Sequence, residues 1–287
     1  MTDLFDFEPR KDLYGVMGNP ITHSKSPRIH RLFAQQTDQR LEYTAIHVDL
    51  GGLAQAVGNF DASGGKGLNI TVPFKQEAWA LVDTRSARAE RAGAVNTIKF
   101  ENDQRYGDNT DGVGLVNDLT LNHRLDLQGQ RILLMGAGGA ARGVLAPLLE
   151  CQPAQLVIVN RTPDKAVEMA AAFADLGKLQ GCGYHELEGQ QFDLVINATA
   201  ASLQGELPPL PDMLLGKAVV CYDMMYGNVT PFMQWAQTHG AVRVLDGLGM
   251  LVEQAAESFY LWRGVRPQTA PVIALLRSEL QTASART

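Results

Sequence analysis

A glycine-rich turn near the middle of the chain constrains its fold more than any other feature. The turn, Gly136-Ala137-Gly138-Gly139-Ala140-Ala141, follows an apolar run at 132–135 and precedes a helical pattern at 142–150. This order of strand, turn and helix is the context of the G-x-G-x-x-A dinucleotide-binding fingerprint. Gly136 allows the tight turn, and Gly138 lets the backbone approach a pyrophosphate, which free N–H groups at the helix start attract. The sequence therefore predicts a dinucleotide site.

The residues after the next expected strand, 156–159, indicate which dinucleotide binds. An NAD site usually has Asp or Glu at this place, where it accepts hydrogen bonds from the ribose 2′-hydroxyl. This chain has Asn160-Arg161-Thr162, with Lys165 one helical turn later. A guanidinium binds a 2′-phosphate in a bidentate way, whereas a carboxylate would repel it. The cluster predicts NADP(H); the alternative is a glycine turn without a ligand beside a solvated arginine.

Length and composition exclude several classes of protein. A chain of 287 residues is long enough for two domains with substantial cores. Its net charge of −6 argues against a nucleic-acid partner, which usually meets a basic surface. The three cysteines are widely spaced, so neither a disulfide framework nor a metal site is expected. The N-terminus is unlike a signal peptide and no apolar run could span a membrane, which predicts a cytoplasmic protein without a membrane partner.

Strand-like and helix-like patterns alternate along the chain, which is typical of an α/β fold. We expect strands at 13–17, 43–48, 68–72, 94–100, 132–135, 156–159, 194–196, 218–222 and 242–245. We expect helices at 27–36, 75–82, 112–121, 142–150, 251–262 and 270–280, and a Pro-rich loop at 204–212. In such folds ligands bind at the carboxyl ends of the strands.

Two serines, Ser24 and Ser26, lie in the loop between the first expected strand and its helix. Hydroxyl groups beside a helix N-terminus can bind a carboxylate without a buried counter-charge. N-capping of the helix fits the same positions. The residues alone leave both interpretations open.

The third expected strand combines polar residues with a lysine just beyond it. Alternation along the strand puts Asn69 and Thr71 on the face opposite the apolar residues. Polar side chains inside a sheet need partners, which a polyol ligand could supply. Lys75 follows at the start of the next helix, where the helix dipole disfavours a lysine. This placement favours an acid–base role; the alternative is an exposed lysine.

Two further polar residues, Asn96 and Asp111, lie at turns or strand ends. A lysine and an aspartate that face one hydroxyl can form a proton-transfer pair, in which the carboxylate orients the ammonium. Lys75 and a carboxylate of this turn, Asp111 or Asp108, are therefore candidates for such a pair. For Asp108 or Asp111, the alternative is N-capping.

Several motifs together resemble the shikimate dehydrogenase family. They are His23-Ser24-Lys25-Ser26-Pro27, Asn69 to Lys75, Ala94 to Thr97, Gly107 to Gly112, Gly136 to Gly143, Asn160-Arg161-Thr162, Tyr222-Asp223-Met224-Met225-Tyr226 and Asp246 to Gln254. They occur in order between about residues 13 and 265, so the resemblance covers nearly the whole chain. It implies NADPH-dependent reduction of 3-dehydroshikimate to shikimate, a step of aromatic amino-acid biosynthesis.

The resemblance also implies a role for each matching position. Ser24 and Ser26 would bind the substrate carboxylate, and Lys75 would be the acid–base with Asp111 beside it. The ring hydroxyls would be bound by Thr71, Asn96, Asp111, Gln254 and, from the cofactor domain, Tyr226; Asn69 joins this set by its place on the strand. The pyrophosphate would contact Gly136, Ala137, Gly138, Gly139 and Ala140, the ribose phosphate Asn160, Arg161, Thr162 and Lys165, and the nicotinamide Met224 and Gly247. Ala87 stands where some members carry an acidic residue at the edge of the cofactor, so it is left out.

We expect two α/β domains with a cleft between them, the second a Rossmann-type dinucleotide-binding domain. The substrate-binding domain would comprise residues 1–111 and 251–287, and the NADP-binding domain residues 112–250. The expected partners are NADP and a small-molecule substrate, shikimate or 3-dehydroshikimate, with a homodimer as a possible assembly. One alternative is a quinate/shikimate dehydrogenase that uses NAD(P), which the basic cluster at 161–165 disfavours. The other is a non-catalytic sensor of a shikimate-like ligand, which would need no proton-transfer pair.

Overall fold

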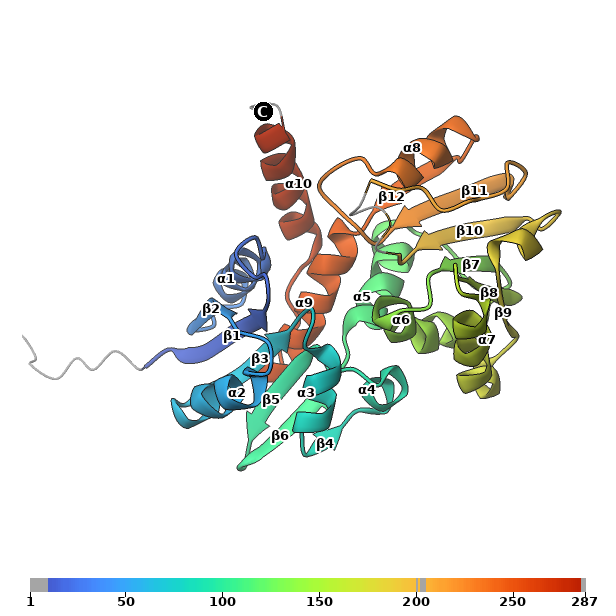
Figure 1. The fold of residues 1–287 in the computed structure, drawn as a ribbon. Coiled ribbons are helices and arrows are strands. Elements are labelled where there is room, and N and C mark those ends of the chain that lie inside the picture. Colours follow the sequence, from blue (N-terminus) through green and yellow to red (C-terminus); the bar gives the residue numbers. More distant parts are fainter. Residues whose placement is uncertain (1–9, 200, 202–204, 285–287) are drawn as a thin grey trace, which may run out of the picture.

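The computed structural model describes residues 10–199, 201 and 205–284. Within these residues the chain forms two six-stranded sheets, each flanked by helices (Figure 1). The expected α/β architecture in two parts is confirmed. Residues 1–9 and 285–287 of the expected substrate-binding domain, and Gln204 of the expected loop, lie outside the described residues.

The first sheet contains the N-terminal strands in the order β2-β1-β3-β5-β6-β4. Strands β1, β2 and β3 are parallel, whereas β5 pairs antiparallel with β3 and β6. The strands are β1 (Asp12–Gly18), β2 (Leu41–His47), β3 (Gly65–Ile70), β4 (Thr84–Arg85), β5 (Thr97–Glu101) and β6 (Gln104–Asp108). The helices between them are α1 (Ser26–Gln36), α2 (Leu53–Ala62), α3 (Lys75–Leu81) and α4 (Ala87–Ala92). Apolar residues of α2 and α3 form one core with the sheet, and α1 belongs to a separate core with the C-terminal helices.

The second sheet is parallel throughout, in the order β12-β11-β10-β7-β8-β9. Its strands are β7 (Arg131–Met135), β8 (Gln155–Val159), β9 (Leu179–Cys182), β10 (Phe192–Asn197), β11 (Leu215–Asp223) and β12 (Arg243–Asp246). Its helices are α6 (Gly139–Glu150), α7 (Pro163–Ala172) and α8 (Pro231–Thr238). The chain winds outward in both directions from β7 and β10, and in such sheets the ligand binds where the winding reverses.

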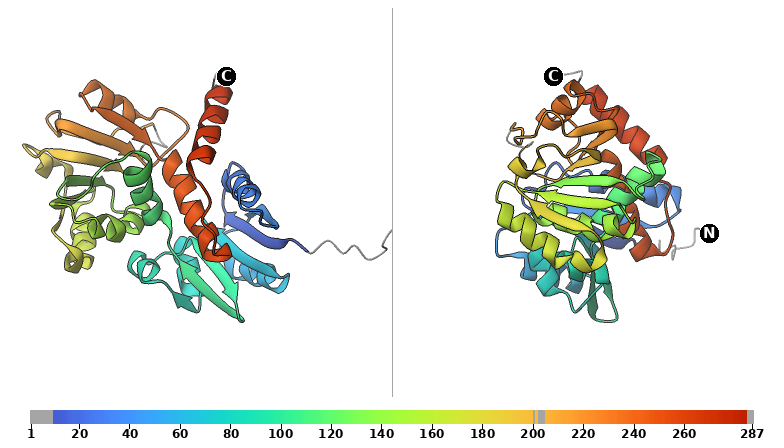
Figure 2. Two further views of the ribbon diagram at one scale, coloured as in Figure 1. Left: turned by 180° about the vertical axis from the view of Figure 1, so that it is seen from behind. Right: turned by 90° about the vertical axis from the view of Figure 1, so that its right-hand side faces the viewer.

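Helices α5 (Asp111–Asn117) and α9 (Leu248–Arg263) lie side by side between the two sheets (Figures 1 and 2). A π-helical turn, Asp118–Asn122, continues α5, and α10 (Ala270–Ser284) packs on α9. Gly114 of α5 is so near α9 that a Cβ atom there would lie 2.7 Å from the backbone nitrogen of Gln254. The two backbones therefore meet directly, and this contact holds Gln254 against the first turns of α5.

The sequence patterns predict the long elements and miss short ones. Every expected strand and helix overlaps an element of the structure. The described residues also form α2, α4, α7, α8, β4, β6 and β9, which the patterns do not predict. The strand expected at 68–72 ends at Ile70, because the chain turns back where the Phe74 N–H donates to the Thr71 carbonyl. As a result Val72 is 65% exposed instead of joining the apolar face.

The contact at Gly114 gives a testable effect on stability. A Cβ at this position would press on the backbone of α9, so Gly114→Ala should lower the free energy of unfolding by about 1–3 kcal/mol. Gly58 is the matched control, because it also lies inside a helix but has open space around its Cβ position. Gly58→Ala should be neutral or raise the free energy by about 0.5–1 kcal/mol. Urea unfolding of both variants measures this; equal effects would contradict the direct helix contact.

Candidate active site

A cavity of about 490 Å³ lies between the two sheets and collects the residues proposed from the sequence for substrate and nicotinamide. Those that line it are Ser24, Ser26, Asn69, Thr71, Lys75, Asn96, Asp111, Met224, Tyr226, Gly247 and Gln254. They come from β3 itself, from the loops after β1, β3, β11 and β12, from the residue before β5, and from the N-terminal parts of α1, α3, α5 and α9. Residues far apart in the chain therefore share one space.

Lys75 and Asp111 form an ion pair in the wall of this cavity. The Lys75 Nζ atom donates to Asp111 Oδ2 at 2.5 Å, and the Asn96 side-chain amide donates to Asp111 Oδ1 at 2.9 Å. The two charged side chains are 29% and 14% exposed, so both remain accessible from the cavity. Asp111 is the first residue of α5 and follows the N-cap Thr110, so the N-capping alternative does not apply to it. The carboxylate is placed to orient the ammonium.

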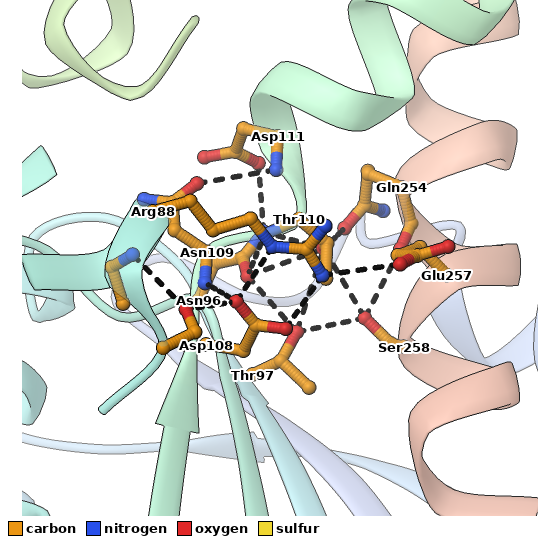
Figure 3. Close-up of polar contacts among 12 residues, drawn as sticks. Arg88, Asn96, Thr97, Asp108, Asn109, Thr110, Asp111, Gln254, Glu257 and Ser258 are labelled. Carbon is orange, nitrogen blue, oxygen red and sulfur yellow. Dashed lines mark hydrogen bonds and ion pairs between the residues drawn. The ribbon is translucent and has the colours of Figure 1, made fainter. Parts of the chain in front are cut away.

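A buried polar network supports this pair (Figure 3). The side-chain oxygen of Asn96 accepts from the Thr110 N–H at 2.9 Å and from the Thr97 hydroxyl at 2.9 Å. Ser258 of α9 lies 2.8 Å from the Thr97 hydroxyl and donates to the Gln254 carbonyl. The network joins β5, the start of α5 and α9, so the cavity wall is held from three elements.

Asn69 differs from the expectation that a ligand must satisfy it. Its amide donates to the carbonyl of Asn96 and to the hydroxyls of Thr97 and Ser258 at 2.9–3.1 Å, and its oxygen accepts from the Tyr43 hydroxyl at 2.7 Å. The residue lines the cavity but is only 6% exposed. Its polar atoms thus have partners within the protein, which the alternation pattern alone could not reveal.

The two serines stand at the start of α1 without occupying its N-cap, which is Lys25. The Ser24 hydroxyl oxygen accepts from the Ser26 N–H at 3.3 Å. Both serines line the cavity, together with His23 and Lys25, which sequence reasoning did not single out. An ammonium beside two hydroxyls makes this end of the cavity suited to an anion.

An apolar wall completes the cavity. It is formed by Ile21, Val72, Met225, Met250 and Leu251, which no motif identified as site residues. Met225 is fixed through the buried Asp223, whose carboxylate accepts from the Met225 N–H at 3.0 Å. Tyr226 follows and packs against the core that α1 forms with α9 and α10. The loop after β11 thus reaches the first sheet's side of the cavity.

A second cavity, of about 500 Å³, lies at the glycine turn. Its lining includes Gly136, Ala137, Gly138, Gly139, Ala140, Asn160, Arg161, Tyr184, Ala198, Thr199 and Glu206. Gly136 has a φ of +106°, a conformation that favours glycine, and α6 begins at Gly139 without a side-chain cap. Its first N–H groups are therefore available to phosphate oxygens.

The four residues proposed for the ribose phosphate divide into two groups. Asn160 and Arg161 line the second cavity, whereas Thr162 and Lys165 lie beside it at the start of α7 and are not among its lining residues. Tyr184 is an addition that the sequence did not indicate, because it follows the unpredicted strand β9. Burial raises the pKa of Tyr184 to about 12, and the positive charge of Arg161 opposes this. Tyrosine and guanidinium therefore lie close together at this end.

No group of side chains in the described part of the chain could hold a metal ion. In the same residues, none of the helices has both the length and the apolar character needed to cross a membrane.

The buried His30 makes the free energy of unfolding depend on pH. Its ring is fully buried and stacks on Tyr43 at 4.1 Å, and burial lowers its pKa to about 3. Between about pH 6.5 and 3 the unfolded chain binds a proton that the folded chain does not. The free energy of unfolding should therefore fall with falling pH by up to about 1.4 kcal/mol per unit from this group.

His30→Leu should remove this contribution, so that stability falls less steeply below pH 6.5 than in the unmodified protein. The control is His47→Gln, since the His47 side chain is 56% exposed and solvent reaches it in both states. Denaturant unfolding from pH 7 to pH 5 gives the two slopes. The interpretation is wrong if both variants keep the slope of the unmodified chain.

The fold and the two cavities together define a class of protein. A doubly wound sheet with a phosphate-binding turn, next to a polar cavity with a lysine–aspartate pair, is the architecture of a two-domain nicotinamide-dependent dehydrogenase. Three family models match the chain. They describe a shikimate dehydrogenase substrate binding domain (residues 16–98), a shikimate/quinate 5-dehydrogenase (119–204) and a shikimate 5′-dehydrogenase C-terminal domain (247–277).

The chain belongs to the shikimate dehydrogenase family. It is 61% identical over 269 residues to the shikimate dehydrogenase (NADP(+)) of Alkalilimnicola ehrlichii, which covers 93% of this chain and 99% of that protein. The crystal structure of an Ael1 enzyme from Pseudomonas putida is 49% identical with a TM-score of 0.90, covering 93% of this chain and 98% of that one. Shikimate 5-dehydrogenase from Thermus thermophilus, in complex with NADP(H) and shikimate, is 29% identical with a TM-score of 0.83, covering 93% and 99%. The resemblance inferred from the motifs is confirmed.

Proposed function

We propose that this chain catalyses the reversible, NADPH-dependent reduction of 3-dehydroshikimate to shikimate, within the pathway to the aromatic amino acids. Membership of the shikimate dehydrogenase family supports this reaction. The observation that carries it is the Lys75–Asp111 pair facing a polar cavity beside a nucleotide-binding sheet. A protein that only sensed such a ligand would need no proton donor held by a carboxylate at 2.5 Å.

The proposed chemistry assigns a role to each side of the first cavity. Bound NADPH would supply a hydride to the ketone carbon. Lys75 Nζ would then donate a proton to the developing alkoxide, while Asp111 holds the ammonium in place. Ser24 and Ser26 would bind the carboxylate at the anion-suited end of the cavity. The remaining ring hydroxyls would meet the polar groups of Thr71, Asn96, Tyr226 and Gln254. Asn69, expected from the sequence to join them, would instead support this wall, because its amide is already paired within the protein.

The second cavity fits NADP. Open space at Gly138 and Gly139 leaves room for a pyrophosphate against the start of α6. Arg161 is exposed at the other end, and the residue directly after β8 is Asn160 instead of a carboxylate that would repel a 2′-phosphate. Thr162 and Lys165 would contribute from the start of α7. The nicotinamide would reach the first cavity near Met224 and Gly247, which line it.

The proposed domain division follows the two sheets. Residues 1–111 and 251–287 would bind substrate, and residues 112–250 would bind NADP. The boundaries near 111 and 250 fall at the start of α5 and in the first turn of α9. A cytoplasmic location and a homodimer are further proposals. The three unpaired cysteines are consistent with a reducing compartment, and sedimentation would measure the assembly.

The reaction is tested directly by steady-state rates with shikimate and quinate, each with NADP+ and NAD+. We expect shikimate with NADP+ to give the highest kcat/KM. The alternative, a quinate/shikimate dehydrogenase, predicts comparable rates with quinate and NAD+. A sensor predicts binding of shikimate without turnover.

Lys75→Met should lower kcat by about 10²–10⁴-fold with a smaller change in KM, because the stem is kept and the proton donor is lost. Asp111→Asn should also lower kcat, and the double variant should lose less than the product of the single losses. Lys99→Met is the matched control: Lys99 is 27% exposed and pairs with Glu101 at 2.9 Å away from the cavity. A Lys75→Met variant with near-normal kcat and raised KM would make Lys75 a binding group only.

Arg161→Ala should weaken NADPH binding by about 2–4 kcal/mol, as expected for a lost charge-assisted contact, and barely change NADH binding. Arg131→Ala is the control, since Arg131 lies at the opposite end of the same sheet and pairs with Asp193. Calorimetric titration with both cofactors measures the difference. Equal losses for NADPH and NADH would show that Arg161 does not read the 2′-phosphate.

A further inference from the structure

Asp108 is a buried carboxylate that the proposed reaction does not use. It is 2% exposed and does not line the substrate cavity. Arg88 of α4 binds it in a bidentate way at 2.7 and 2.6 Å, and the Ser86 hydroxyl donates to it at 2.5 Å. Buried charges are costly unless they are paired, and here Arg88 and Ser86 pair with the Asp108 carboxylate.

The cluster is linked to Asp111 through a short chain of hydrogen bonds. The Asn109 N–H donates to Asp108 Oδ1 at 2.7 Å, and the Asn109 side-chain oxygen accepts from the Asp111 N–H at 3.2 Å. The Asn109 amide also donates to the Ala94 carbonyl at 3.1 Å. Asp108 therefore fixes the loop that carries Asp111 to the start of α5 (Figure 3).

Arg88 also reaches the helix that carries Gln254. Its guanidinium lies 3.1 Å from Glu257 Oε1, and Arg266 holds the other oxygen of Glu257 at 2.8 Å. Glu257 is three residues after Gln254 on α9, so the contact acts within one helical turn of it. Burial disfavours the charged form of Arg88, but the two carboxylates raise its pKa overall, so it stays a cation.

We propose that Arg88 is a positioning residue, which sets Asp111 relative to Lys75 and to α9 by binding Asp108 on one side and Glu257 on the other. A planar guanidinium can serve two carboxylates at once in fixed geometry, which a lysine cannot. This inference rests on the proposed function, because its effect is read through the Lys75–Asp111 pair. If the Arg88 ion pairs were purely structural, their loss would lower the stability of the protein, and the effect on kcat would be the same with or without the Asp111 carboxylate.

The test compares Arg88→Met in the unmodified chain and in an Asp111→Asn background. In the unmodified chain, we expect kcat with shikimate and NADP+ to fall about 10- to 100-fold and KM to change less than about 3-fold. In the Asp111→Asn background, the same change should lower kcat less than about 2-fold, because the carboxylate that Arg88 positions has already lost its charge. Equal fold losses in both backgrounds would overturn the inference.

A control and a milder variant complete the experiment. Arg131→Met removes another bidentate arginine, bound to Asp193 at 3.1 and 2.7 Å far from the cavity, and should leave kcat unchanged. If Arg88→Met does not fold, Glu257→Gln keeps the side-chain volume and weakens only the link to α9. It should lower kcat about 3- to 10-fold, and less than about 2-fold in the Asp111→Asn background.

The outcomes separate this inference from the function on which it rests. An unmodified protein that does not oxidise shikimate with NADP+ would refute the proposed function. An active protein whose Arg88→Met variant keeps its kcat would refute the positioning role alone. For Glu257→Gln, an unchanged kcat would overturn the link between Arg88 and α9.

Discussion

The direct contact between α5 and α9 is the constraint on which the active site depends. Asp111 lies one turn before Gly114, and Gln254 lies against Gly114, so a single helix pair sets the separation of two cavity residues. The far end of α5 is held by the buried carboxylate of Asp118, which accepts from the Tyr222 hydroxyl of β11 at 2.7 Å. The helix is therefore tied to the first sheet's loops at its start and to the second sheet at its end.

The polar part of the cavity wall includes Asn69 and Asn96, with Thr97 and Ser258 bonded to them from outside the lining, and these groups are already paired. Asn69, Asn96, Thr97 and Ser258 are all buried, and each bonds to at least one of the others. An unpaired amide or hydroxyl in this position would cost free energy, so the network permits few alternative arrangements. A ligand that enters meets side chains with little freedom left to lose, which lowers the entropic cost of binding.

Short sequence motifs predict the nucleotide site. They do not predict the contacts that support the Lys75–Asp111 pair. The turn at 136–141 and Arg161 are close in the chain and have a fixed order, so the sequence predicts their cavity. Family resemblance, and no local pattern, predicts that Lys75 and Asp111 lie side by side, because 36 residues separate them. Whether Asp108 caps a helix or binds Arg88 depends on where α4 packs, and α4 is a six-residue helix that no periodicity predicts. Contacts between short, distant elements leave no pattern in the sequence.

Helix α1 is covered by the two C-terminal helices, and this has a consequence for folding during synthesis. Its buried Ile29 and Phe33 pack against residues of α9 and α10, including Phe259, which are synthesised after the whole second sheet. The nucleotide-binding strands run from 131 to 246 without interruption, so they can assemble as they emerge. The apolar face of α1, on the substrate side, stays uncovered until α9 and α10 have been synthesised. Completion of the substrate pocket thus requires the last helices of the chain to be synthesised.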